Sequence, residues 1–240
     1  MKPLARASQA IVRKLLANRS MYDLAEREVN ERKFKEWCVR HPAARTLRGP
    51  YEARDEMYAA LMKDASLEGA IDYLEFGVFA GRSLKWWLSA NKDPASSFVG
   101  FDSFLGLPED WRAGRQAGTF ARGGKPPQID DSRCRFEIGW FTDTLPPFVR
   151  AFGHPRRTVI HLDADLYSST LFVLTTLAPV LRNGDILVFD ELHDSCHEGR
   201  ALLDFESGFG FEFEVLVGMN GHGRAALRIT KALTSATTPG

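Results

Sequence analysis

Two pairs of acidic residues each follow an apolar run in the second half of the chain. Asp163 and Asp165 stand in "HLDADLYSST", and Asp190 and Glu191 end "DILVFDE". An unpaired carboxylate at the end of a buried strand is costly, so these acids need partners. If the two strands are neighbours, Asp163, Asp190 and Glu191 approach one another, and such hard oxygen ligands select Mg²⁺ or Ca²⁺. We therefore predict a site for Mg²⁺ or another hard divalent cation. The alternative is that each acid caps a turn or pairs with an arginine.

A second constellation, "EFGVFAGRS", contains two glycines with separate tasks. Gly77 allows a tight turn after a strand, and Gly81 lets the backbone approach a ligand at a helix start. The stretch is not the dinucleotide pattern G-x-G-x-x-G, because Phe79 would crowd a pyrophosphate. Asp102, 25 residues after Gly77, suits hydrogen bonds to ribose hydroxyls. These residues predict a nucleoside site without a diphosphate cradle, which fits S-adenosylmethionine.

Side chains around this turn complete the predicted cofactor site. Glu75 would favour the cationic end of the cofactor. Trp140 or Phe141 would stack on the adenine, unless both rings belong to the core. The predicted cofactor-binding residues are Glu75, Gly77, Val78, Phe79, Gly81, Ser83, Asp102, Gly139, Trp140, Phe141 and Asp163.

Strands that alternate with helices must position these groups. Helical spacing recurs in residues 51–64, 82–90 and 168–183, and seven segments are predicted as strands: 71–75, 96–102, 133–141, 157–165, 185–191, 211–218 and 224–230. The fold class is α/β, with a doubly wound, mostly parallel seven-stranded Rossmann-like sheet and an antiparallel last strand. Ligands bind at the carboxyl ends of parallel strands, so the acids and the glycine turn should share one edge.

One long segment, residues 104–127, fits neither the strand period nor the helix period. A loop of this length inside a compact domain is usually functional or disordered. We expect a lid over the carboxyl edge of the sheet, because Phe104, Leu107, Trp111 and Phe120 are too apolar for a solvated linker. A floppy insertion is the alternative.

The chain divides into three predicted parts: an N-terminal helical arm (1–70), a catalytic domain (71–231) and a loose tail (232–240). Residues 1–50 hold 12 Lys and Arg against five Asp and Glu, although the whole chain has no net charge. A solvated basic helix is the favoured interpretation of this imbalance. An organelle transit segment or a membrane-surface helix is the alternative for residues 1–20. Helical arms often pack against a second subunit, so we expect a homo-oligomer.

Composition narrows the function classes further. No basic excess marks a nucleic-acid binder, and no apolar run approaches the ~20 residues of a membrane span. Three scattered cysteines, Cys38, Cys134 and Cys196, predict free thiols in a reducing cytoplasm. The stretch "ELHDSCHE" offers His193, Cys196 and His197 as zinc ligands, but without a second ligand pair a polar loop and helix start after the fifth strand are favoured.

Five blocks occur in a fixed order: "YLEFGVFAGRSL", "GFDSFLGLPEDW", "GWFTDTLP", "HLDADLYSST" and "GDILVFDE". Together they resemble the macrocin O-methyltransferase family over about residues 50–230, with boundaries good to a few residues. The resemblance implies a class I, S-adenosylmethionine-dependent enzyme, typically metal-dependent, that methylates sugar hydroxyls in natural-product pathways. It implies a cofactor site at Glu75, Gly77, Gly81 and Asp102.

The resemblance also implies that Asp163, Asp190 and Glu191 match the metal-binding positions of the family. The pair Asp190-Glu191 departs from the Asp-Asp or Asp-Asn of metal-dependent relatives such as catechol O-methyltransferase. Glu is one methylene longer, so direct ligation by Glu191 is the weakest part of this assignment.

The expected reaction is in-line methyl transfer to a hydroxyl of a glycoside, polyol or phenol, with Mg²⁺ lowering the pKa of that hydroxyl. Asp165 is the first candidate for the base that takes the proton, followed by His161 and His193. Alternatively, Asp165 caps the helix that begins at Ser168. Two other functions stay open. One is a non-catalytic binding or regulatory protein. The other is a nicotinamide-dependent sugar oxidoreductase, which Phe79 and the missing third glycine disfavour.

Overall fold

A computed structural model describes residues 19–50 and 53–233 of the chain, so most of residues 1–20 and of the predicted tail lie outside it. Its helices are α2 (Arg19–Arg40), α3 (Arg54–Asp64), α4 (Arg82–Ala90), α5 (Phe141–Ala151), α6 (Tyr167–Leu177) and α7 (Glu198–Phe209). Its strands are β1 (Arg45–Leu47), β2 (Ile71–Phe76), β3 (Ser97–Asp102), β4 (Cys134–Ile138), β5 (Arg157–Leu162), β6 (Ile186–Phe189), β7 (Glu212–Met219) and β8 (Arg224–Lys231).

The strands form one sheet in the order β1-β7-β8-β6-β5-β2-β3-β4. Only β8 runs antiparallel to its neighbours, β6 and β7, and the other described pairs are parallel. The predicted α/β sheet with an antiparallel last strand is therefore confirmed. It has eight strands rather than seven, because Arg45–Leu47 adds a short edge strand from the segment predicted as a helical arm.

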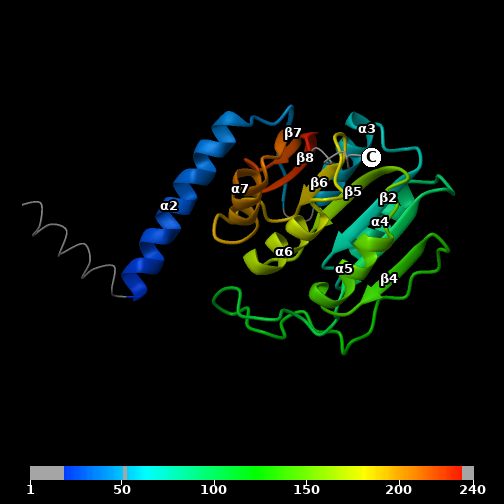
Figure 1. Cartoon of the computed structure of the whole chain (residues 1–240), viewed down its shortest axis with the longest axis horizontal. Coiled ribbons are helices and arrows are strands. Elements are labelled where there is room, and N and C mark those ends of the chain that lie inside the picture. Colours follow the sequence, from blue (N-terminus) through cyan, green and yellow to red (C-terminus); the bar gives the residue numbers. More distant parts are fainter. Residues whose placement is uncertain (1–18, 51–52, 234–240) are drawn as a thin grey trace, which may run out of the picture.

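Alternating side chains divide the interior into two cores, one on each face of the sheet. Phe76, Leu162 and Phe189 pack on the face covered by α5, α6 and α7. Tyr73 and Val159, whose side chains point to the opposite side of the same strands, pack on the face covered by α3 and α4. Figure 1 shows the helices flanking the sheet in this layered arrangement. Burial of each large apolar side chain stabilises the fold by roughly 1.5–3 kcal/mol.

The predicted arm is only partly separate from the domain. The C-terminal half of α2 packs beside α7, where Trp37 is fully buried and its Nε1 donates to Glu206 Oε1 at 3.3 Å. The first turns of α2 extend away from the body (Figure 1) and expose Met21, Tyr22 and Leu24, while Glu26 pairs with Arg200 of α7. In contrast, α3 belongs to the domain core through Tyr58 and its neighbours.

One helix, α5, is not predicted by the sequence patterns. The strand predicted over 133–141 ends at Ile138, and α5 begins at Phe141. Pro146 and Pro147 lie inside α5 and conceal it, because proline normally argues against a helix interior. Helix α7 begins at Glu198, the last residue of "ELHDSCHE", where a polar loop and a helix start are expected. The helix predicted over 168–183 stops at Leu177, just before Pro179.

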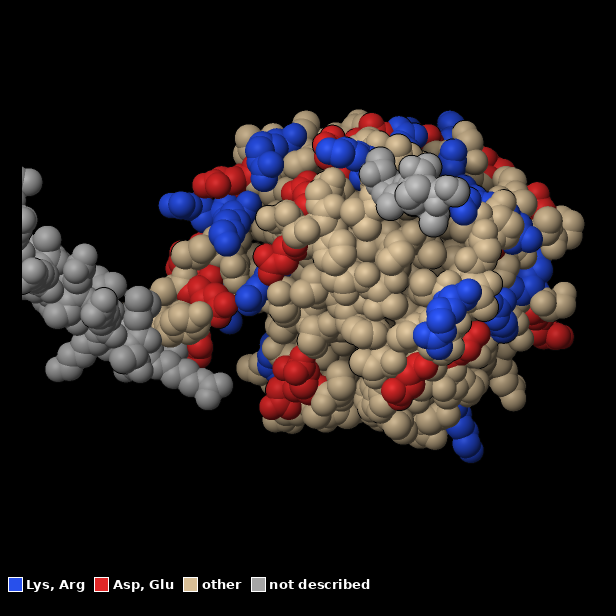
Figure 2. Space-filling model, viewed as in Figure 1, with Lys and Arg blue, Asp and Glu red and all other residues tan. Residues whose placement is uncertain are grey.

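The surface carries its charges unevenly. Figure 2 shows a broad uncharged area in the middle of the face in view, with charged side chains gathered toward its rim. Helix α6, "YSSTLFVLTTL", has no charged residue.

None of the described helices combines the length and apolarity that crossing a membrane requires. The three cysteines are free thiols, as predicted.

Candidate functional site

The carboxyl ends of the central parallel strands lie level with one another. Phe76 pairs with Phe101 and with Leu162, and Leu162 pairs with Phe189. The ladder continues for one residue beyond the strands. Gly77 N donates to Phe101 O, Asp163 N to Phe76 O and Asp190 N to Leu162 O, each at 3.0 Å. The glycine turn and the two acid pairs therefore begin at one edge of the sheet.

A cavity of about 990 Å³ opens at this edge, near the upper end of the ~300–1,000 Å³ usual for small-molecule sites. Most of the predicted site residues line it: Gly77, Val78, Phe79, Ser83, Asp102, Gly139, Trp140, Phe141, Asp163, Asp165, Glu191 and His193. Four predicted residues do not: Glu75, Gly81, His161 and Asp190.

Asp102 builds the turn that forms one half of the cavity, the glycine-turn half. Its Oδ2 accepts hydrogen bonds from the N–H groups of Val78 (3.0 Å) and Phe79 (2.9 Å). Its Oδ1 accepts one from Phe104 N at 2.7 Å. Gly77 has φ +91°, and a Cβ there would lie 1.9 Å from Asp163 O, so only glycine fits. This turn brings β2, β3 and β5 together around the cavity.

Glu75 and His161 lie behind the turn, fully buried on the α3/α4 face. Ser83 Oγ donates to Glu75 Oε1, and the Tyr73 hydroxyl donates to Glu75 Oε2, both at 2.7 Å. The Tyr73 hydroxyl also contacts His161 Nδ1 at 2.7 Å. Glu75 thus ties β2 to α4 through Ser83. His161 is held in this network and does not line the cavity, in contrast to Asp165 and His193.

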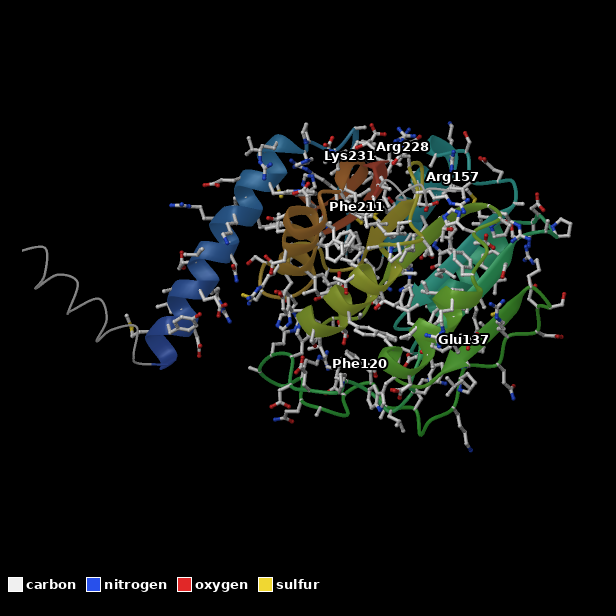
Figure 3. The ribbon with its side chains drawn as sticks, viewed as in Figure 1. Phe120, Glu137, Arg157, Phe211, Arg228 and Lys231 are labelled. Atoms are coloured by element: carbon white, nitrogen blue, oxygen red, sulfur yellow. The ribbon has the colours of Figure 1, made fainter. Side chains whose placement is uncertain are left out.

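The segment predicted as a lid folds against the domain. Leu107, Trp111 and Phe120 gather with Leu166 in a small apolar cluster, and Ser168 Oγ donates to Glu109 Oε1 at 2.5 Å. Phe120 also packs edge-on against Phe79, with ring centroids 5.6 Å apart. Figure 3 shows Phe120 on this loop, which runs beneath α5 and α6 in the view. The loop supplies a wall of the cavity, including Trp111, Arg112 and Arg115.

The acid half of the cavity is lined by Asp163, Asp165 and Glu191, with Asp190 behind them, and arginines lie close to these acids. Arg224 Nε donates to Asp190 Oδ1 at 2.7 Å, and its second nitrogen donates to Asp190 Oδ2 at 3.2 Å. A nitrogen of Arg54 lies 3.6 Å from Asp190 Oδ1 and 3.8 Å from Asp163 Oδ2. Sequence reasoning missed both arginines.

Burial and charge push the acid pKa values apart. Burial and the charge of Asp190 raise the pKa of Asp163 well above its ordinary value. Burial would raise the pKa of Asp190 as well, but the hydrogen bonds and charge of Arg224 and the charge of Arg54 hold it below its usual range. Burial and the neighbouring Glu191 raise the pKa of Asp165 to about 7. Burial also raises the pKa of Glu191, although Arg112, 3.7 Å away, opposes the shift.

This arrangement does not fit the predicted metal ion. No three Asp, Glu, His or Cys side chains in the described part of the chain form a group that could hold one. Both oxygens of Asp190 accept from Arg224, and Arg54 already places a cation near the carboxylates of Asp163 and Asp190. The arrangement matches the alternative, in which the acids pair with arginines. The zinc alternative at His193, Cys196 and His197 fails in the same way, because these described residues form no ligand group either.

Asp165 has the geometry of a functional residue rather than a helix cap. Helix α6 has Leu166 at its N-cap position, and no side chain makes a capping hydrogen bond there. Asp165 has φ +60°, a conformation that non-glycine residues seldom adopt and that clusters at functional sites. The residue lines the cavity together with Asp163 and Glu191. Its carboxyl group is therefore available to a ligand.

Comparisons with known proteins identify a methyltransferase domain and its fold. The family described as "Methyltransferase domain" matches residues 74–192. A 4'-O-methyltransferase from Streptomyces olivaceus that acts on 8-demethyl-8-(2,3-dimethoxy-alpha-L-rhamnosyl)-tetracenomycin C is 32% identical over 162 residues, which are 58% of this chain and 59% of that protein. The chain thus spans about three-fifths of that relative's length.

Two solved structures share the fold. The calicheamicin methyltransferase CalS11 superposes with a TM-score of 0.54 at 21% identity, covering 84% of this chain and 91% of that one. The O-methyltransferase NovP superposes with a TM-score of 0.55 at 25% identity, covering 74% and 80%. The expected class I methyltransferase fold is confirmed.

Proposed function

We propose that this chain, whose residues 74–192 belong to the methyltransferase domain family, transfers a methyl group from S-adenosylmethionine to a hydroxyl oxygen of a sugar or other small natural product. One observation carries the proposal. A nucleoside-type turn, built by Gly77 and Asp102, and a half-buried acid with a pKa near neutrality, Asp165, face the same cavity.

The glycine-turn half would bind the cofactor. Asp102 stands at the end of β3, where an acid suits ribose hydroxyls, and Trp140 and Phe141 offer aromatic surfaces to the adenine. When bound, S-adenosylmethionine supplies an activated methyl group. Bound there, it would donate this methyl group to the acceptor oxygen, and the electron pair of the carbon–sulfur bond would stay on sulfur.

Asp165 would take the acceptor's proton. A base works best when its pKa lies close to the working pH, and the pKa of Asp165 is about 7. The carboxylate accepts the proton from the hydroxyl as the new carbon–oxygen bond forms, and it releases that proton to solvent afterwards. His193 also lines the cavity and is the second candidate; its Nδ1 lies 3.2 Å from Gly223 O.

The acceptor class rests on the comparisons and on the cavity. The named substrate of the Streptomyces relative is a rhamnosyl natural product. A cavity of about 990 Å³ is large enough to hold a cofactor and a sugar together. Magnesium is not part of the proposal, because the acids that would bind it are engaged by arginines.

The test is a calorimetric titration of the protein with S-adenosylmethionine and with NAD⁺. We expect one S-adenosylmethionine site per chain and no NAD⁺ binding, since Phe79 occupies the position where a dinucleotide fold needs glycine. Labelled S-adenosylmethionine with a panel of glycosides and catechols should then give mass-shifted products. NAD⁺ binding alone would favour the oxidoreductase. Cofactor binding without turnover on any panel member would favour a non-catalytic binding protein.

A further inference from the structure

We propose that Arg54, supported by Arg224, takes the place of a metal ion in this site, so that methyl transfer is metal-independent and Arg54 donates hydrogen bonds to the acceptor oxygen. This inference rests on the proposed function. It follows from the way the acid half of the cavity is neutralised.

The sheet sets the geometry. Side chains alternate along each strand, and Leu162 and Phe189 face α5, α6 and α7. Asp163 and Asp190 directly follow these two residues and therefore turn toward the α3/α4 face. Helix α3 begins at Arg54 on that face, and its guanidinium reaches both carboxylates, at 3.8 Å and 3.6 Å. A shared cation between two strand ends is the role that the sequence pattern assigned to a metal.

Arg224 stabilises this arrangement, in which an arginine takes the place of a metal ion. It approaches from the start of β8, the strand beside β6, and binds Asp190 through two nitrogens. Two-point binding of a carboxylate by guanidinium is strong and directional. The side chains of Asp190 and Arg224 are almost fully buried, at 1% and 4% exposure, so solvent screens the pair little. A metal ion would have to displace this pair to gain Asp190 as a ligand.

Arg54, unlike Arg224, also lines the cavity. A guanidinium is a planar group with five N–H donors, so it can contact carboxylates on one side and a ligand oxygen on another. Fixed positive charge near the reacting oxygen would stabilise negative charge that develops there. Both arginines fall outside residues 74–192, so the matched domain contains Asp163 and Asp190 but not the two arginines that neutralise them.

Manganese binding tests the inference without relying on turnover. We expect electron paramagnetic resonance to show no stoichiometric Mn²⁺ on the EDTA-dialysed parent protein. Stoichiometric Mn²⁺ binding by the parent that D163N removes would overturn the inference. S-adenosylhomocysteine titration of the same samples reports on the proposed function separately, so the two can fail independently.

Kinetics on an acceptor found by the panel tests Arg54 itself. EDTA should leave the parent rate unchanged. Arg54→Met should lower kcat/KM by about 100-fold, as expected for loss of one charged donor at the reacting oxygen, and Arg54→Lys should recover part of the loss. Arg157→Met is the matched control, because Arg157 sits at the opposite end of β5 and donates to Ala65 O (Figure 3). Equal rates for Arg54→Met and Arg157→Met, or a rate that EDTA abolishes and Mg²⁺ restores, would overturn the inference.

Discussion

In the two halves of the cavity, the acids are paired with groups that lie at different distances along the sequence. In the glycine-turn half, the carboxylate of Asp102 is satisfied by backbone N–H groups of Val78, Phe79 and Phe104. In the acid half, Asp190 is satisfied by side chains from α3 and β8, Arg54 and Arg224. The first arrangement depends on backbone conformation and is encoded in a short motif. The second depends on topology, so single distant substitutions can change its chemistry while the strand-end acids stay in place.

The largest effect is expected at the acid half. Asp165→Asn should lower kcat by about 10²–10⁴-fold, the usual contribution of a positioned base, with little change in cofactor affinity. Asn is also one of the few residues that tolerates φ near +60°, so the backbone at this position should be kept. The measurement is steady-state kinetics with circular dichroism on the same protein. A kcat within a few-fold of the parent would move the base to His193.

Gly77→Ala should be nearly as damaging, but through the cofactor. The new Cβ would lie 1.9 Å from Asp163 O at φ +91°, and the turn must move. We expect S-adenosylmethionine affinity to fall by about 100-fold, a cost of about 2.8 kcal/mol at 1.4 kcal/mol per factor of ten. Calorimetric titration measures it. Gly114→Ala is the control, since it has a similar φ of +78° but nothing within 4 Å; equal losses for both would show that backbone strain, not the clash, is responsible.

Asp102→Asn should also weaken cofactor binding in the glycine-turn half, but by less. An amide offers one oxygen in place of two, so it cannot satisfy all three N–H donors of the turn. Loss of one charge-assisted hydrogen bond, worth ~1.5–3 kcal/mol, should weaken cofactor binding by about 10- to 100-fold. Glu137→Gln is the control, because Glu137 is an acid on the neighbouring strand β4 (Figure 3) and does not line the cavity. Unchanged affinity in Asp102→Asn would remove Asp102 from the cofactor site.

The smallest expected effect, over the last pH unit below neutrality, is a pH dependence carried by Asp165. Its pKa is raised to about 7 by burial and by Glu191 and Asp190, and the deprotonated form is the active base. The value of kcat/KM should therefore rise about tenfold per pH unit up to pH ~7 and level off above it. The residual activity of Asp165→Asn should lack this slope. A slope that persists in the variant would assign the ionisation to another group.

The glycine-turn half could be predicted well from the sequence, because the residues that form it lie close together along the chain. Gly77 follows a strand, Asp102 ends the next strand, and both lie within one strand–helix–strand unit. The strand-end acids were also placed at one edge correctly, since parallel strands share an edge. Strand alternation turns Glu75 with Tyr73 toward the α3/α4 face, where Ser83 binds it, so its contact with the cofactor stays a prediction.

The arginines could not be found in this way. Arg54 is the first residue of α3 and Arg224 the first of β8, and neither belongs to a motif with the acids. Their proximity depends on the insertion of β8 next to β6 and on the placement of α3 above it. The carboxylates at the carboxyl edge of the sheet therefore correctly indicated a cation between them. The sequence pattern could not distinguish a metal ion from a guanidinium group.

The most direct test of the division between the two halves is S-adenosylhomocysteine calorimetry on the parent, Asp102→Asn and Asp165→Asn. We expect one site per parent chain, binding weakened in Asp102→Asn, and binding unchanged in Asp165→Asn despite its loss of turnover. A parent that fails to bind S-adenosylhomocysteine, or two variants that lose affinity equally, would contradict this division.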